Sequence, residues 1–147
     1  MRISDILTAK RVYTDSKADD KRELLQFLAS KAARSLDVDE RTIFDALLER
    51  ESLGSTAFGH GTAFPHARLA NIKKVKAFFA RLDNAIDFEA VDGQPVDLVF
   101  VLISPEDSGA DHLTALASIS RLLKDEEICK KVRKAKNNDA IYSILSK

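Results

Sequence analysis

The sequence predicts a mixed α/β fold, with a small mixed β-sheet flanked by helices on both faces. The first observation is the run Val96–Ser104, VDLVFVLIS, which is rich in strand-forming residues and too short for a stable buried helix. The second is that helical patterns lie before this run and after it, an order typical of a sheet covered on both faces. The third is the length of 147 residues, which fits a single domain, 1–147, able to bury its own core.

Two helices are expected in the first third of the chain. The sequence DKRELLQFLASKAARSL begins with the capping pair Asp20 and Glu23 and continues with apolar residues at helical spacing. Asp37 and Glu40 give a second capping signal, and Gly54 follows this second helix as its C-cap. Before both helices, residues 1–13 predict a short helical turn followed by an edge strand.

The second half of the chain predicts strands followed by helices. Val75–Leu82, VKAFFARL, is apolar on both alternating faces and predicts a strand covered on both sides. A turn at Asp92 and Gly93 separates it from the central strand. His112–Leu123 returns to a helical period, and the remainder divides near Asn137 into two short helices.

Composition argues against several functions. Lys plus Arg and Asp plus Glu both number 23, so no net field attracts nucleic acid or an anionic membrane. There is no apolar run of membrane-spanning length and no signal-peptide core, so we expect a cytoplasmic protein without membrane insertion. The single cysteine, Cys129, cannot form an internal disulfide and is expected to be a buried structural thiol. No familiar metal or nucleotide motif is present, so we expect neither a metal nor another cofactor.

The least ordinary stretch is Arg50–Leu69, RESLGSTAFGHGTAFPHARL, which holds two of the three histidines. Its glycines and Pro65 leave little of it able to form helix. A long connection of small and polar residues is where function usually lies. Reactive side chains are therefore expected first in this stretch.

His66 is the candidate reactive group, because Pro65 restrains its backbone at the end of the glycine-containing loop. Arg50 can supply a permanent forked charge, and the hydroxyls of Ser55 and Thr56 can supply neutral donors. Together these residues describe a pocket for a tetrahedral anion. The alternatives are a histidine that only satisfies hydrogen bonds and an arginine that only complements the C-terminal dipole of a helix.

His112 is a second candidate, since it lies in the first turn of a helix that leaves the central strand. Ligands in open α/β sheets gather at such strand ends, and the positive end of a helix favours a neutral imidazole able to donate one hydrogen bond. The alternative is a helix-start histidine with no such task. The sequence does not show whether His66 and His112 meet.

The stretch ERESLGSTAFGHGTAFPHARL resembles the Arg-Glu-x-x-Gly-Ser-Thr signature and the Pro-His phosphorylation motif of the enzyme IIA domains of the mannitol/fructose class of the bacterial phosphotransferase system. The likeness is greatest to the nitrogen-related branch and extends through AIDFEAVDGQPVDLVFVLISPED to the terminal DAIYSIL. Departures from the family pattern occur at Phe58, His60 and Phe64 and at Ala67-Arg68, where Gly-Lys is common. Phe58 and Phe64 either widen an apolar docking rim or merely fill space.

This resemblance implies the IIA fold and a phosphocarrier in which His66 accepts a phosphoryl group from a phosphorylated HPr-type protein. Arg50 and His112 then occupy the supporting positions of the family, and no nucleotide or metal is required. The nitrogen-related branch implies a regulator whose phosphorylation state changes its binding to targets such as a transporter or a sensor kinase. One alternative is a fructose- or mannitol-specific IIA that passes phosphate to a IIB cysteine. Another is a binding module of the same fold that is not phosphorylated.

Overall fold

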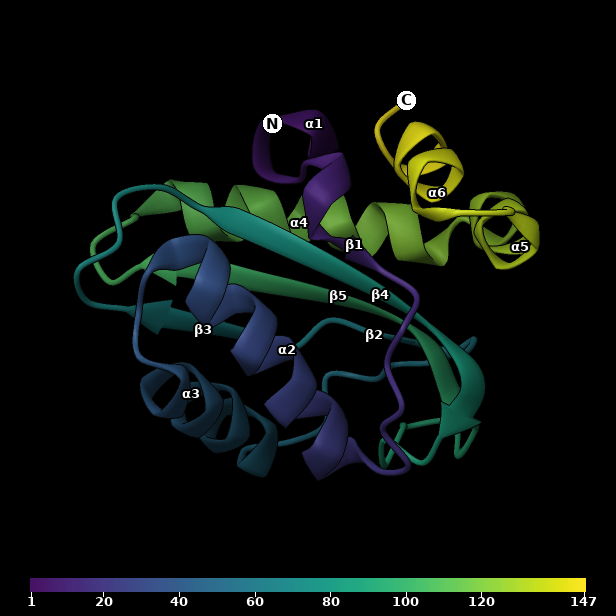
Figure 1. Cartoon of the computed structure of the whole chain (residues 1–147), viewed down its shortest axis with the longest axis horizontal. Helices are drawn as coiled ribbons and strands as arrows, with labels where there is room; N and C mark the ends of the chain where they lie inside the picture. The colour runs from purple at the N-terminus through teal and green to yellow at the C-terminus, as the bar shows by residue number, and fades with distance from the viewer.

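The chain folds into three layers, described here for residues 1–147 by a computed structural model. A five-stranded sheet lies in the middle, with α2 and α3 on one face and α1, α4, α5 and α6 on the other (Figure 1). The helices are α1 (Ile3–Ile6), α2 (Lys21–Leu36), α3 (Glu40–Ser52), α4 (Ala110–Lys124), α5 (Glu126–Lys134) and α6 (Asn138–Leu145). The strands are β1 (Val12–Tyr13), β2 (Thr62–Ala63), β3 (His66–Leu69), β4 (Lys76–Ile86) and β5 (Val96–Pro105). This mixed sheet with helices on both faces confirms the predicted fold class.

The sheet has the order β1-β4-β5-β2, and β3 also pairs with β5. Only the β4 and β5 pair is antiparallel. The short strands β2 and β3 therefore follow one another along the same edge of β5, with Thr62 opposite Leu98 and His66 opposite Leu102. The sequence had indicated only a loop here. The structure instead sets His66 at the first position of a strand, beside the carboxyl half of β5.

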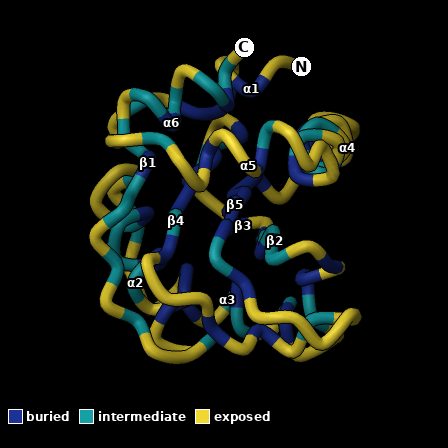
Figure 2. Tube along the Cα trace, turned by 90° about the vertical axis from the view of Figure 1, so that its right-hand side faces the viewer, coloured by how far each residue is buried: buried dark blue, intermediate teal, exposed yellow.

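The central strand β5 is buried on both faces, as its composition predicts. Val99, Phe100 and Val101 have no exposed surface. Alternate residues contact two separate cores, so Val99 and Val101 pack toward α2 and α3 while Phe100 packs toward α4 and the C-terminal helices. Figure 2 shows this buried centre beneath a more exposed outer surface. The strand thus gives the residues at its end a rigid base.

Helix capping corrects one prediction. Asp20 caps α2 as expected, because its carboxylate accepts a hydrogen bond from the Glu23 amide at 2.8 Å. However, α3 is capped by Asp39, which accepts from the Thr42 amide at 3.0 Å, and not by Asp37. Asp37 instead ends α2 in the left-handed conformation, with φ of 55°. Asp is short and polar and tolerates that conformation. Asp37 therefore ends α2, although its spacing to Glu40 had predicted that it would cap α3.

The C-terminal part of the chain follows the predicted pattern. Gly109, with φ of 58°, turns the chain from β5 into α4 and brings His112 into the first turn of that helix. Asn137 caps α6 by accepting from the Ala140 amide at 2.9 Å, which confirms the division into two short helices. None of the helices combines the length and the apolar character needed to cross a membrane.

Candidate functional site

A cavity of about 380 Å³ opens where the last turn of α3, strand β3 and the start of α4 meet. Ligand pockets commonly measure about 300–1,000 Å³, so this one lies at the lower end of that range. It is lined by Ala46, Glu49, Arg50, Leu53, His66, Ala67, Arg68 and His112. The three residues that the sequence singled out most strongly, Arg50, His66 and His112, therefore lie together.

The hydrogen bonds of His66 define its tautomer. Its Nδ1 lies 2.9 Å from the carbonyl oxygen of Phe64, and because a carbonyl only accepts, Nδ1 carries the proton. On the other side of the ring, Nε of Arg50 donates to Nε2 at 3.2 Å, which requires a lone pair on Nε2. Both contacts select the same neutral form of the imidazole. The unprotonated nitrogen is thus the one beside the guanidinium.

The environment of His66 favours the neutral ring. Burial lowers the pKa of His66 below its ordinary value, and the positive charges of Arg50 and Arg68 act in the same direction. The bond to the Phe64 carbonyl and the charge of Glu51 oppose this shift without reversing it. At neutral pH the ring therefore keeps the lone pair that a nucleophile needs.

His112 does meet His66, a point that the sequence left open. The two ring centroids are 5.6 Å apart with an angle of 56° between the ring planes. His112 is buried, and its Nδ1 lies 2.6 Å from the hydroxyl of Ser104, near the end of β5. Burial, followed by the charge of Arg68, lowers the pKa of His112 to about 4. This ring is also neutral at physiological pH.

Two residues of the site were missed by the sequence interpretation. Arg68 lines the cavity and adds a second positive charge to that of Arg50, and Ser104 orients His112. The run VDLVFVLIS did contain a signal for Ser104, because a hydroxyl at the end of a buried apolar strand must find a partner. Arg68 lies two positions beyond His66 on β3, so it points to the same face of the strand.

The structure does not bring the hydroxyls of Ser55 and Thr56 into the cavity. Ser55 Oγ donates to the Phe88 carbonyl at 2.7 Å and accepts from the Ala57 amide at 3.1 Å. Thr56 is fully buried, and its hydroxyl donates to the carboxylate of Glu51. Neither residue lines the cavity. Their hydroxyls hold the loop, and the donors available to an anion come from Arg50, Arg68 and the histidines.

His60 and Cys129 lie away from the cavity. His60 is exposed, adopts a left-handed conformation with φ of 59°, and its Nδ1 lies 3.6 Å from the carboxylate of Glu126. Cys129 is buried on α5, where its thiol donates to the Leu123 carbonyl at 3.4 Å and burial raises its pKa. The prediction of a buried structural thiol is confirmed.

The site thus combines an unprotonated imidazole nitrogen, a second neutral histidine and two guanidinium groups around a small cavity. Guanidinium groups are well suited to phosphoryl oxygens, and a neutral histidine is a nucleophile near physiological pH. The fold and this cavity define a mixed α/β protein whose candidate site is centred on a histidine.

Comparison with known proteins identifies the family. Residues 5–147 match the family described as "Phosphoenolpyruvate-dependent sugar phosphotransferase system, EIIA 2", and the chain belongs to this family. It is 50% identical over 146 residues to a "Nitrogen regulatory protein" of Bradyrhizobium diazoefficiens, a match that covers 99% of this chain and 95% of that protein.

Solved structures agree with this assignment. The crystal structure of the nitrogen regulatory protein IIA-Ntr from Neisseria meningitidis matches with a TM-score of 0.92 and 29% identity, over 97% of this chain and 98% of that one. The mannitol IIA structure from Escherichia coli matches with a TM-score of 0.79 and 20% identity, over 94% and 97%, and supports the fold alone.

Proposed function

We propose that this chain is a phosphocarrier regulatory protein of a nitrogen-related phosphotransferase relay, and that His66 accepts a phosphoryl group from a phosphorylated HPr-type protein. The observation that carries the proposal is the contact at 3.2 Å between Nε of Arg50 and the unprotonated Nε2 of His66. It sets a nucleophilic nitrogen and a guanidinium side by side in a cavity. The similarity to nitrogen regulatory proteins supports the choice of relay.

The proposed transfer runs between two imidazoles. The Nε2 lone pair of His66 forms a bond to phosphorus while the nitrogen–phosphorus bond of the donor histidine breaks and returns its electron pair to the donor ring. The Nδ1 proton of His66 stays on its ring, bonded to the Phe64 carbonyl. That carbonyl dipole stabilises the positive charge that develops on the ring as Nε2 is phosphorylated.

The surrounding groups act on the phosphoryl oxygens. As the Nε2 lone pair of His66 bonds to phosphorus, the Nε–H of Arg50 moves from Nε2 to an equatorial oxygen. Arg50 and Arg68 then supply positive charge to the equatorial oxygens as the group passes between the two rings. With the Ser104 hydroxyl donating to Nδ1 of His112, the Nε2 hydrogen of His112 is left to bind a phosphoryl oxygen. In this scheme positioned side chains perform the transfer, and no cofactor or metal takes part.

The experiment is phosphorylation of the purified chain with phosphoenolpyruvate, enzyme I and an HPr-type donor. We expect one acid-labile phosphoryl group on the unaltered protein and none on His66→Ala. His60→Ala is the matched control, because His60 is an exposed histidine on the same connection but outside the cavity. It should be labelled as the unaltered chain is. Continued labelling of His66→Ala would show that the acceptor is another residue.

Regulation is tested by recovering binding partners with the phosphorylated and unphosphorylated protein. In the proposed role, a target such as a transporter or a sensor kinase binds one of the two states and does so in the cytoplasm. Rapid transfer from His66 to the cysteine of a fructose-type IIB protein would instead identify a sugar-specific IIA. An unlabelled chain that still binds partners would identify a binding module without phosphotransfer.

A further inference from the structure

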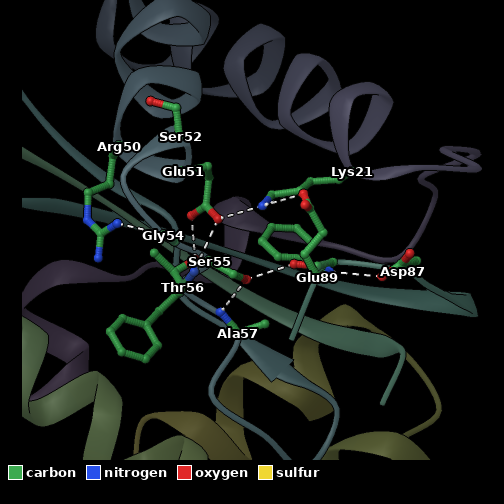
Figure 3. A network of polar contacts seen from close by, with 12 residues as sticks. Lys21, Arg50, Glu51, Ser52, Gly54, Ser55, Thr56, Ala57, Asp87 and Glu89 are labelled. Atoms are coloured by element: carbon green, nitrogen blue, oxygen red, sulfur yellow. Dashed lines mark hydrogen bonds and ion pairs between the residues drawn. The ribbon is translucent and has the colours of Figure 1, made fainter. Parts of the chain in front are cut away.

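The last turn of α3 carries a buried carboxylate directly beside the guanidinium of the site. Arg50 and Glu51 are consecutive, and successive helical positions point about 100° apart, so the two side chains leave the helix in different directions. Arg50 reaches the cavity, whereas Glu51 points inward and is only 6% exposed. Figure 3 shows Glu51 facing Lys21 and Thr56. Burying a carboxylate costs free energy unless the charge is paired and hydrogen-bonded, so the partners of Glu51 indicate its role.

Three donors satisfy this carboxylate. Nζ of Lys21, from the first turn of α2, lies 3.0 Å from Oε1. The amide of Thr56 donates to the same oxygen at 3.1 Å, and the Thr56 hydroxyl donates to Oε2. Lys21 balances the charge, and the two bonds from Thr56 fix both the side chain and the main chain of that residue.

The bonds continue from Thr56 to the reacting ring. The carbonyl of Thr56 accepts from the amide of Phe64 at 3.3 Å, and the carbonyl of Phe64 accepts from Nδ1 of His66 at 2.9 Å. The path therefore runs from Glu51 through two main-chain units to the proton that determines the tautomer of His66. Because Arg50 contacts the other ring nitrogen, two consecutive residues of α3 are connected to the two nitrogens of the same histidine, one directly and one through this path.

We propose that Glu51 is a positioning residue for His66. Through Thr56 it holds the Phe64 carbonyl in place, keeps the proton of His66 on Nδ1, and so keeps on Nε2 the lone pair that is to accept the phosphoryl group. The effect on transfer rests on the function proposed above. The effect on the tautomer does not, since it concerns the resting protein.

The alternative is that Glu51 and Lys21 form an ion pair that only stabilises the fold. Replacing a buried ion pair by apolar side chains of similar volume is often neutral for stability, so in the paired substitution Lys21→Met with Glu51→Leu the main loss is the acceptor of the Thr56 amide and hydroxyl. Thr56→Val is a milder second variant that removes one hydroxyl of the path and keeps the Thr56 amide. Thr62→Val is the matched control, because Thr62 is also buried and its hydroxyl donates to a main-chain carbonyl, that of Gly59, outside the path.

The first measurement is the ¹⁵N chemical shifts of the His66 ring in the unphosphorylated protein, which report the tautomer directly. We expect the unaltered chain and Thr62→Val to carry the proton on Nδ1. In the paired variant the ratio of the two tautomers should fall by about fivefold, the change expected for the loss of one ordinary hydrogen bond. A smaller fall in the same direction is expected for Thr56→Val. An unchanged tautomer ratio in a folded paired variant would overturn the proposal. If the paired variant does not fold, an unchanged ratio in Thr56→Val would do so.

The second measurement is the rate of phosphorylation by the HPr-type donor as its concentration is varied. Loss of a residue that orients a reacting group typically costs about 10–100-fold, and we expect the paired variant to lose this much in maximal rate with its apparent KM for the donor unchanged. A variant that transfers as the control does would overturn the proposal. If even the unaltered chain accepts no phosphate, the proposed function fails, while the tautomer measurement still decides the role of Glu51.

Discussion

Replacing His112 by glutamine should make the folded protein less sensitive to mild acid. The pKa of His112 is lowered to about 4 from an ordinary value of 6.5, chiefly by burial and then by the charge of Arg68. Between these two values the unfolded chain binds a proton that the folded chain does not. The stabilisation is therefore complete above pH 6.5 and is lost as the pH falls from 6.5 toward 4. His112→Gln removes this titration and keeps a side chain that can bind the Ser104 hydroxyl.

The two pKa values set the size of the effect. The full gap corresponds to at most about 3.5 kcal/mol, since a shift of one pKa unit is worth about 1.4 kcal/mol. Between pH 7 and pH 5 the same linkage gives a loss of at most about 1.8 kcal/mol. The ring is only 5% exposed but borders the cavity, so these figures are upper limits. The corresponding shift of Tm is at most roughly 4–7 °C for a domain of this size.

The assay is denaturant unfolding at pH 7 and at pH 5, in buffers of equal ionic strength. The free energy of unfolding of the unaltered chain should fall by up to about 1.8 kcal/mol more than that of His112→Gln. Part of the acid sensitivity should remain in the variant, because the pKa of His66 is also lowered by burial. Equal losses in the two proteins would refute the assignment of a neutral, strongly shifted His112.

Three further substitutions test the fold that supports the site. Gly61→Ala should lower the free energy of unfolding by about 1–3 kcal/mol in thermal unfolding, because φ of Gly61 is 75° and an added Cβ would lie 2.7 Å from Arg133 Nη2. A stability equal to that of the unaltered chain would contradict this backbone strain. Phe100→Ala should cost about 3–5 kcal/mol by denaturant titration, since the ring is fully buried between β5 and the C-terminal helices, and a cost below about 1 kcal/mol would be inconsistent with that packing. Asp20→Ala should cost about 1 kcal/mol through loss of the α2 cap, and an unchanged midpoint would argue against the cap.

The elements that the sequence predicted well depend on local patterns. Helix α2 follows from a cap and a helical period, and β5 follows from a continuous run of strand-forming residues. Strands β2 and β3 were not predicted, because two and four residues carry no readable period and each strand exists only by parallel pairing with β5. The predicted cap of α3 was placed at Asp37 and not at Asp39, because spacing does not distinguish an N-cap from a residue that ends the preceding helix.

The residues of the candidate site could be predicted where the residue type itself indicates a chemical role. Arg50, His66 and His112 were named from the sequence, and the fold brings them to one cavity. The directions of the Ser55 and Thr56 side chains were not predictable, because they depend on a partner distant in sequence and on an inward-facing carboxylate. Hydroxyls beside a glycine suit an anion site and a loop anchor equally well, and only the folded environment distinguishes the two.

Burial alone would not prepare His66 for the proposed transfer, because it favours a neutral ring without choosing between the two tautomers. The choice comes from one contact on each side of the ring. The Phe64 carbonyl requires a proton on Nδ1, and the guanidinium of Arg50 requires a lone pair on Nε2. In the proposed function, both requirements are already met in the resting protein, so no change of tautomer is needed when a donor docks. The last turn of α3 carries Arg50 directly and is bonded to Phe64 through Thr56, so a shift of this turn would disturb both contacts together.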